Sequence, residues 1–76
     1  MEDTFKLRIC SDLEYEEMVV DICWNNNTVA LLNREKGIDN LEIEIFPPDE
    51  SNSWKFPLDK FIETIQNAKK CLIEMN

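Results

Sequence analysis

Hydrophobic and polar residues alternate along the first part of the chain. Phe5, Leu7 and Ile9 are separated by polar residues, which is the period-two pattern of a half-buried β-strand over residues 4–10. The same alternation returns over residues 17–24 and predicts a second strand. Its apolar side carries Met18, Val20, Ile22 and Trp24.

Turn-forming residues separate these strands from two more. Three asparagines at 25–27 follow the second strand, and asparagine tolerates the left-handed backbone conformation of short hairpin loops. We therefore expect a hairpin that leads into a third strand over residues 28–33. The only glycine, Gly37, lies in the next predicted turn, where a positive φ is most useful. A fourth strand is expected over residues 41–46.

The end of the chain has the periodicity of a helix. Residues 47–53 include two prolines and several turn formers, so they predict a loop. Residues 54–56 are a possible short fifth edge strand, and Pro57 suits the first position of a helix. We expect that helix over residues 58–74, because apolar residues recur there at three- and four-residue steps: Leu58, Phe61, Ile62, Ile65, Ala68 and Leu72.

The order of these elements predicts an α+β fold in a single domain, residues 1–76. Four consecutive strands form an antiparallel meander, and the C-terminal α-helix packs on one face of the sheet. The covered face should be the more apolar one, and the opposite face should remain open to solvent. The residues expected beneath the helix are Leu7, Ile9, Met18, Val20, Ile22, Leu41, Ile43 and Ile45.

Acidic residues are concentrated in the predicted sheet. The net charge is −8, and residues 1–52 hold 13 acids against 4 bases, whereas residues 53–76 hold 3 acids against 4 bases. Glu42 and Glu44 should lie on the open face beside Glu17 and Asp21. This row is either a solvated face that keeps a small domain soluble or a docking surface for a basic partner. Pairing with Lys6, Arg8 and Arg34 should neutralise part of it.

Two aromatic residues lie near the acids. Tyr15 is within the acidic segment before the second strand, and aromatic anchors often dominate protein interfaces. Trp54 follows the proline-rich loop and either anchors a partner or caps the core at the entry to the helix, whereas Trp24 is expected in the core. The candidate partner-binding residues are Glu14, Tyr15, Glu16, Glu17, Asp21, Glu42, Glu44, Asp49, Glu50 and Trp54.

The composition argues against most other functions. Histidine is absent, which removes the commonest general base and every Ser-His or Cys-His arrangement, and one glycine is too few for a phosphate-binding loop. The three cysteines have no zinc spacing and are expected to be buried thiols. We therefore expect no enzyme, no cofactor and no metal. Strong acidity argues against direct nucleic-acid binding and against a membrane surface, and the chain is expected to be cytoplasmic.

Three segments resemble a known family. YEEMVVDI (15–22), EKGIDNLEIEI (35–45) and FPLDKFIETIQNAKKCL (56–72) are similar in acidity and element order to the small immunity proteins of bacterial contact-dependent growth inhibition and other polymorphic toxin systems. The resemblance implies a protein that binds a delivered toxin domain, commonly a basic nuclease, and blocks it. No site residue is carried over from the family.

The sequence thus predicts an immunity protein, or antitoxin, that occludes the active site of its toxin or a nearby exosite. An acidic regulatory or adaptor domain is the alternative. We expect a monomer, although a homodimer through an apolar band of Val19, Cys23 and Leu32 on the open face is a further alternative.

Overall fold

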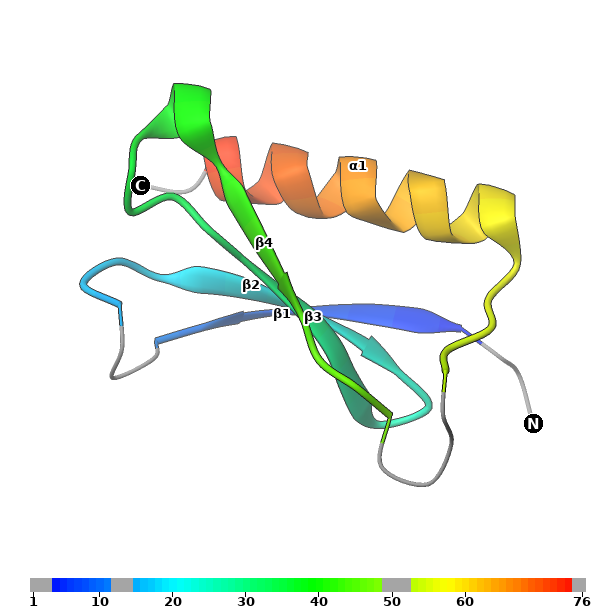
Figure 1. Cartoon of the computed structure of the whole chain (residues 1–76). Coiled ribbons are helices and arrows are strands. Elements are labelled where there is room, and N and C mark those ends of the chain that lie inside the picture. The colour runs from blue at the N-terminus through cyan, green and yellow to red at the C-terminus, as the bar shows by residue number, and fades with distance from the viewer. Residues whose placement is uncertain (1–3, 12–14, 49–52, 75–76) are drawn as a thin grey trace.

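The computed structural model describes residues 4–11, 15–48 and 53–74. Within these ranges the sheet has the strand order β1-β2-β3-β4, and every neighbouring pair is antiparallel (Figure 1). The predicted α+β fold is confirmed, and each predicted boundary lies within two residues of the observed one. The elements are β1 (Phe5–Cys10), β2 (Val19–Trp24), β3 (Asn27–Asn33), a 3-10 turn (Ile38–Asn40), β4 (Glu42–Ile45) and α1 (Leu58–Glu74).

Both predicted turns use positive φ angles. Asn25 and Asn26 have φ of 48° and 71° in the two-residue loop between β2 and β3, as a tight hairpin requires. Gly37 has φ of 98° and ψ of 165°, a conformation that is essentially restricted to glycine. Its N–H donates to the carbonyl of Arg34 at 3.0 Å, and its own carbonyl accepts from Asn40 at 3.1 Å. The connection from β3 to β4 is therefore fixed by local hydrogen bonds.

A β-bulge changes the register between β2 and β3. Continuous pairing from the hairpin would place Leu32 opposite Val19, but the pairing shifts between Ile22 and Cys23, so that Leu32 lies opposite Val20. The extra residue of the bulge is Val29, which is fully buried in the main core. The prediction that Leu32 lies on the open face is therefore wrong, because a one-residue shift moves a side chain to the other face.

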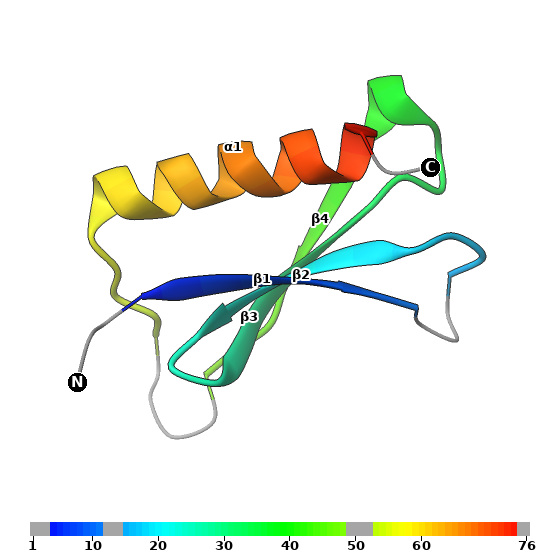
Figure 2. The ribbon, with the colours of Figure 1, turned by 180° about the vertical axis from the view of Figure 1, so that it is seen from behind.

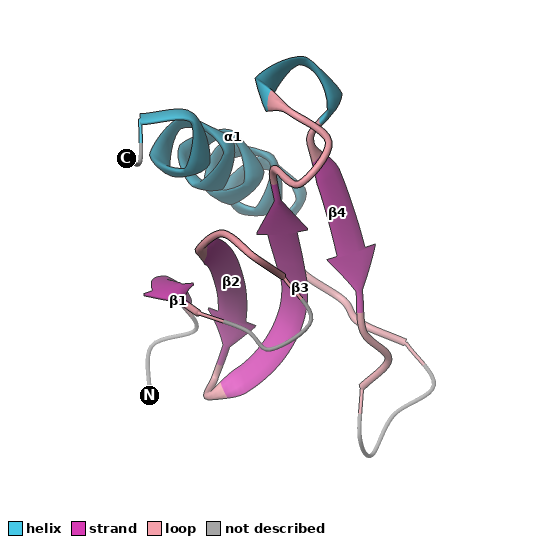
Figure 3. Ribbon diagram, turned by 90° about the vertical axis from the view of Figure 1, so that its left-hand side faces the viewer, coloured by secondary structure: helices cyan, strands magenta, loops and turns pink. Residues whose placement is uncertain are grey.

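The helix covers the middle of the sheet rather than all of it. Ala68 and Leu72 of α1 are fully buried against β2 and β3, and Figure 3 shows β4 standing to one side of the helix. A helix is about 10 Å wide and strands are about 4.8 Å apart, so one helix shields only two or three strands. The prediction that α1 covers Ile9, Met18, Ile43 and Ile45 is wrong, since these side chains are 51%, 38%, 42% and 61% exposed.

Aromatic side chains close the core at the start of the helix. The ring of Phe56 contacts Phe5, Trp24 and Phe61 with centroid distances of 4.9–5.1 Å. Residues 54–56 do not form the possible fifth strand. Trp54 instead stacks on Phe56, and its indole N–H donates to the carbonyl of Phe46 at 2.7 Å. This segment is thus held by side chains rather than by a backbone ladder.

Candidate protein-binding surface

The sheet face opposite α1 is partly covered by the chain itself. Val19 and Leu31 point to this face but are only 0% and 5% exposed. Tyr15, in the segment before β2, donates its hydroxyl to Oε1 of Glu44 on β4 at 3.3 Å. Because β3 lies between β2 and β4, the Tyr15 side chain must cross β3 to reach Glu44. The predicted open face therefore has a buried centre and an exposed margin.

The segment that carries Tyr15 is attached to the connection between β3 and β4. The backbone N–H groups of Glu16 and Glu17 donate to the two carboxylate oxygens of Glu35 at 2.8 and 3.2 Å. Glu17 in turn forms an ion pair with Arg34 at 3.4 Å. A carboxylate that accepts two backbone hydrogen bonds is held in one orientation, so this end of the sheet presents fixed negative charges.

Five exposed carboxylates gather at this end and along β4, and we call them the acidic surface: Glu16, Glu17, Glu35, Glu42 and Glu44. Two cations offset part of its charge: Arg34, which was predicted to do so, and Lys36, which was not. Arg34 is only 13% exposed and pairs with Glu17, and the exposed Lys36 contacts Glu42 at 3.0 Å. Exposed ion pairs are weak and are screened by salt, so the surface retains a negative field.

Asp21 does not contribute an exposed charge. It is 9% exposed, and its Oδ2 accepts hydrogen bonds from Arg8 at 3.2 Å and from the thiol of Cys10 at 3.5 Å. The predicted exposure of Asp21 is wrong because β2 is an inner strand whose side chains are covered by those of its neighbours. Burial, followed by the negative charge of Asp21, raises the pKa of the Cys10 thiol.

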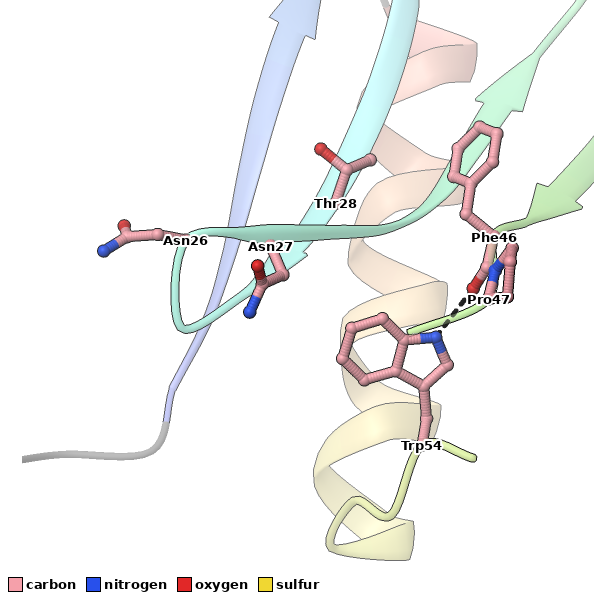
Figure 4. A pocket seen from close by; sticks show the side chains of 6 residues that line it. All are labelled: Asn26, Asn27, Thr28, Phe46, Pro47 and Trp54. Carbon is pink, nitrogen blue, oxygen red and sulfur yellow. Dashed lines mark hydrogen bonds between the residues drawn. The ribbon is translucent and has the colours of Figure 1, made fainter. Parts of the chain in front are cut away.

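Trp54 lies at the other end of the sheet from the acidic surface. It lines a recess of about 450 Å³ beside the β2–β3 hairpin, together with Asn27, Thr28 and Phe46 (Figure 4). Trp54 is partly buried by contacts with the core, which is the arrangement predicted for a residue that caps the core. Its role as a partner anchor stays a prediction.

Several other predicted features have clear outcomes. Glu14, Asp49 and Glu50 lie outside the described residues. Cys23 is buried as expected, whereas Cys10 and Cys71 are half-buried free thiols. The proposed apolar dimer band is wrong, because Val19 and Cys23 are buried on one face and Leu32 is buried on the other.

Glu35 is a member of the acidic surface that the sequence interpretation missed. The predicted meander was sufficient to place Glu35 beside the segment before β2. In such a sheet the β1–β2 connection and the β3–β4 connection lie at the same end, so residues 15–17 and 34–36 must be neighbours.

Among the described residues, no group of acids and cysteines is arranged to hold a metal ion, and no helix is long and apolar enough to cross a membrane. Comparison with protein families, curated proteins and solved structures gave no match.

Proposed function

We propose that this chain is an immunity protein that binds and neutralises a basic toxin domain, such as a nuclease, in the cytoplasm. The acidic surface supports this proposal. A nuclease active site attracts phosphates, and a row of carboxylates offers the same charge to the same site. Binding there would exclude the nucleic acid, so the mechanism would be occlusion.

The observation that carries the proposal is the fixed position of three of these carboxylates. Glu35 accepts two backbone N–H groups, Glu17 pairs with a nearly buried Arg34, and Glu44 accepts the hydroxyl of Tyr15. Side chains that are already ordered lose less conformational entropy when they bind a partner. A face that only keeps the protein soluble would not require its carboxylate side chains to be ordered.

The contacts in this proposal are the acidic surface and Tyr15. Electrostatic complementarity would raise the association rate by about 10- to 1,000-fold over that of a neutral surface. Asp21 has no direct part in the contact, because it is only 9% exposed, unlike the five carboxylates of the acidic surface. Its ion pair with Arg8 instead joins β1 to β2.

A protection assay tests the proposed function. The immobilised chain is used to capture its partner from the cells that produce it, and the captured domain is then expressed alone and together with this chain. We expect the domain to stop growth when expressed alone and to be harmless in the presence of the chain. A captured partner that does not affect growth would make the chain an adaptor and would contradict the proposal.

A further inference from the structure

Among the described residues, no further strand pairs with the outer edge of the sheet at β4. β4 is the last strand in the order β1-β2-β3-β4, and the N–H of Phe46, just after it, donates to Val29 of β3 at 2.8 Å. In an antiparallel pair, alternate residues direct their backbone groups toward the neighbouring strand and away from it. Counting back from Phe46, the N–H and C=O groups of Ile43 and Ile45 therefore point outward from the sheet.

An apolar groove follows this edge on the side of the helix. Ile43 and Ile45 lie opposite the core residues Leu32 and Ala30, but α1 does not cover them. The groove has a volume of about 450 Å³ and lies between β4 and α1. Its lining residues are mostly apolar: Leu32, Ile38, Leu41, Ile43, Ile45 and Ile65, with Asp39, Glu42 and Lys69 at its margins.

The other side of the same strand is acidic. Glu42 and Glu44 alternate with the two isoleucines and lie opposite Asn33 and Leu31, on the face away from α1. The edge of β4 thus presents outward backbone groups between an apolar groove and a pair of exposed carboxylates. The side chains of an added strand also alternate between the two faces, so one set would contact the apolar groove and the other set the carboxylates.

A second copy of this chain is a poor occupant. In the symmetric antiparallel pairings that overlap most of β4 and keep both helices on one face, Glu44 lies opposite either Glu44 or Glu42 of the other copy. Like charges directly opposite each other destabilise a sheet. The charge pattern therefore favours a partner strand with basic residues on that face.

We propose that the outer edge of β4 binds an extended segment of a partner protein as a fifth strand, and that this segment alternates apolar and basic residues. Its apolar side chains fill the groove beside Ile43 and Ile45, and its basic side chains face Glu42 and Glu44. Backbone hydrogen bonds supply part of the affinity, and the two alternating faces set the register. Only the identification of the partner as a toxin rests on the proposed function.

Synthetic peptides test this inference without knowledge of the partner. The probe is a capped eight-residue peptide in which isoleucine or valine alternates with lysine. One control peptide has glutamate in place of lysine, and another has the same residues as the probe with the lysines grouped at one end. Binding to the full chain is measured by fluorescence anisotropy at low salt, and amide hydrogen exchange is followed residue by residue.

We expect the alternating basic peptide to bind at least about tenfold more tightly than either control, because only it satisfies both faces of the edge. It should slow amide exchange at Ile43 and Ile45, whose N–H groups point outward. Equal binding of the grouped peptide, or no slowing at these two amides, would mean that charge alone attracts the peptide and would overturn the inference.

A pair of matched variants locates the site. Ile45→Lys places a charge in the groove and should weaken binding of the basic peptide about tenfold. Ile9→Lys makes the same change at the similarly exposed edge strand β1 and should leave binding unchanged. A dimer in native mass spectrometry that Ile45→Lys dissociates would show that a second copy occupies the edge, which contradicts the proposal.

The inference and the proposed function fail in different ways. If the peptide binds at β4 but the captured partner is not toxic, the strand-addition site stands and the immunity function does not. If the peptide does not bind at β4 and Ile45→Lys still protects cells as well as the unmodified chain does, the immunity function stands and strand addition at β4 is ruled out.

Discussion

The guanidinium of Arg34 donates a hydrogen bond of 3.1 Å to the backbone carbonyl of Leu72. This contact joins the end of β3 to the last turn of α1, and Figure 2 shows the two segments close together from behind. The carbonyls of the last helical turn have no partner within the helix, and a cation there also interacts favourably with the helix dipole. Because Arg34 also pairs with Glu17, it connects the helix, the sheet and the acidic surface.

Arg34→Ala should therefore lower the free energy of unfolding by about 1–2 kcal/mol, since it removes a partly buried hydrogen bond and an ion pair. Lys36→Ala is the matched control. Its ion pair with Glu42 is exposed, so the change should stay within about 0.5 kcal/mol. Urea unfolding followed by circular dichroism measures both variants. Equal effects would show that Arg34 does not link the helix to the sheet.

The uneven cover of the sheet by α1 predicts uneven sensitivity to small changes in volume. Ile22→Val removes one methylene group from a fully buried side chain and should cost about 1 kcal/mol. Ile45→Val makes the same change at a side chain that is 61% exposed and should cost only a few tenths of a kcal/mol. Chemical denaturation measures the two values. A cost at Ile45 equal to that at Ile22 would mean that the helix covers β4 after all.

The conformation of Gly37 predicts that a side chain is unfavourable there for reasons of backbone geometry alone. A Cβ atom at this position would meet nothing within 4 Å, but its φ is 98°. Gly37→Ala should therefore destabilise the protein by about 1–3 kcal/mol through backbone strain. Asn26→Gly is the control. Glycine adopts the left-handed conformation of Asn26 without steric cost, so this change should be neutral within about 0.5 kcal/mol. Thermal unfolding of both variants tests the difference.

The environment of Cys10 predicts its reactivity. Burial and the Asp21 carboxylate raise the pKa of this thiol, so the thiolate forms at higher pH than in a free cysteine and alkylation at a given pH is slower. Asp21→Asn removes the negative charge, so the pKa should fall and the midpoint of the pH–rate profile should move to lower pH. Mass spectrometry of iodoacetamide-treated protein measures the rate, with the half-buried Cys71 as an internal reference. A shift of both cysteines together would indicate loosening of the fold instead.

The positions of the strands and the helix could be predicted because each has a clear hydrophobic period. The register of β3 could not, because the bulge at Val29 leaves no mark in a run of apolar residues that are buried on either face. Leu31 and Leu32 have the same side chain, and only the bulge decides which of them faces α1.

The acidic surface could be predicted only in part, because some of it depends on contacts between elements. Alternation correctly placed Glu42 and Glu44 on one side of β4, because that strand is short and regular. The burial of Asp21 depends on contacts between strands, which a single-strand pattern does not contain. The exposure of Ile43 and Ile45 depends on the width of one helix compared with that of four strands, and the pattern of each element alone gives no information about it.

The association rate between this chain and its captured partner, measured by stopped-flow fluorescence over a range of NaCl concentrations, tests the central claim most directly. The combined change of Glu42→Lys and Glu44→Lys should slow association about tenfold or more at low salt and flatten its salt dependence. The same change in charge at the exposed residues Asp59 and Glu63 of α1 should have a much smaller effect. Equal slowing by the two pairs, or no slowing by either, would contradict a binding role for the acidic surface.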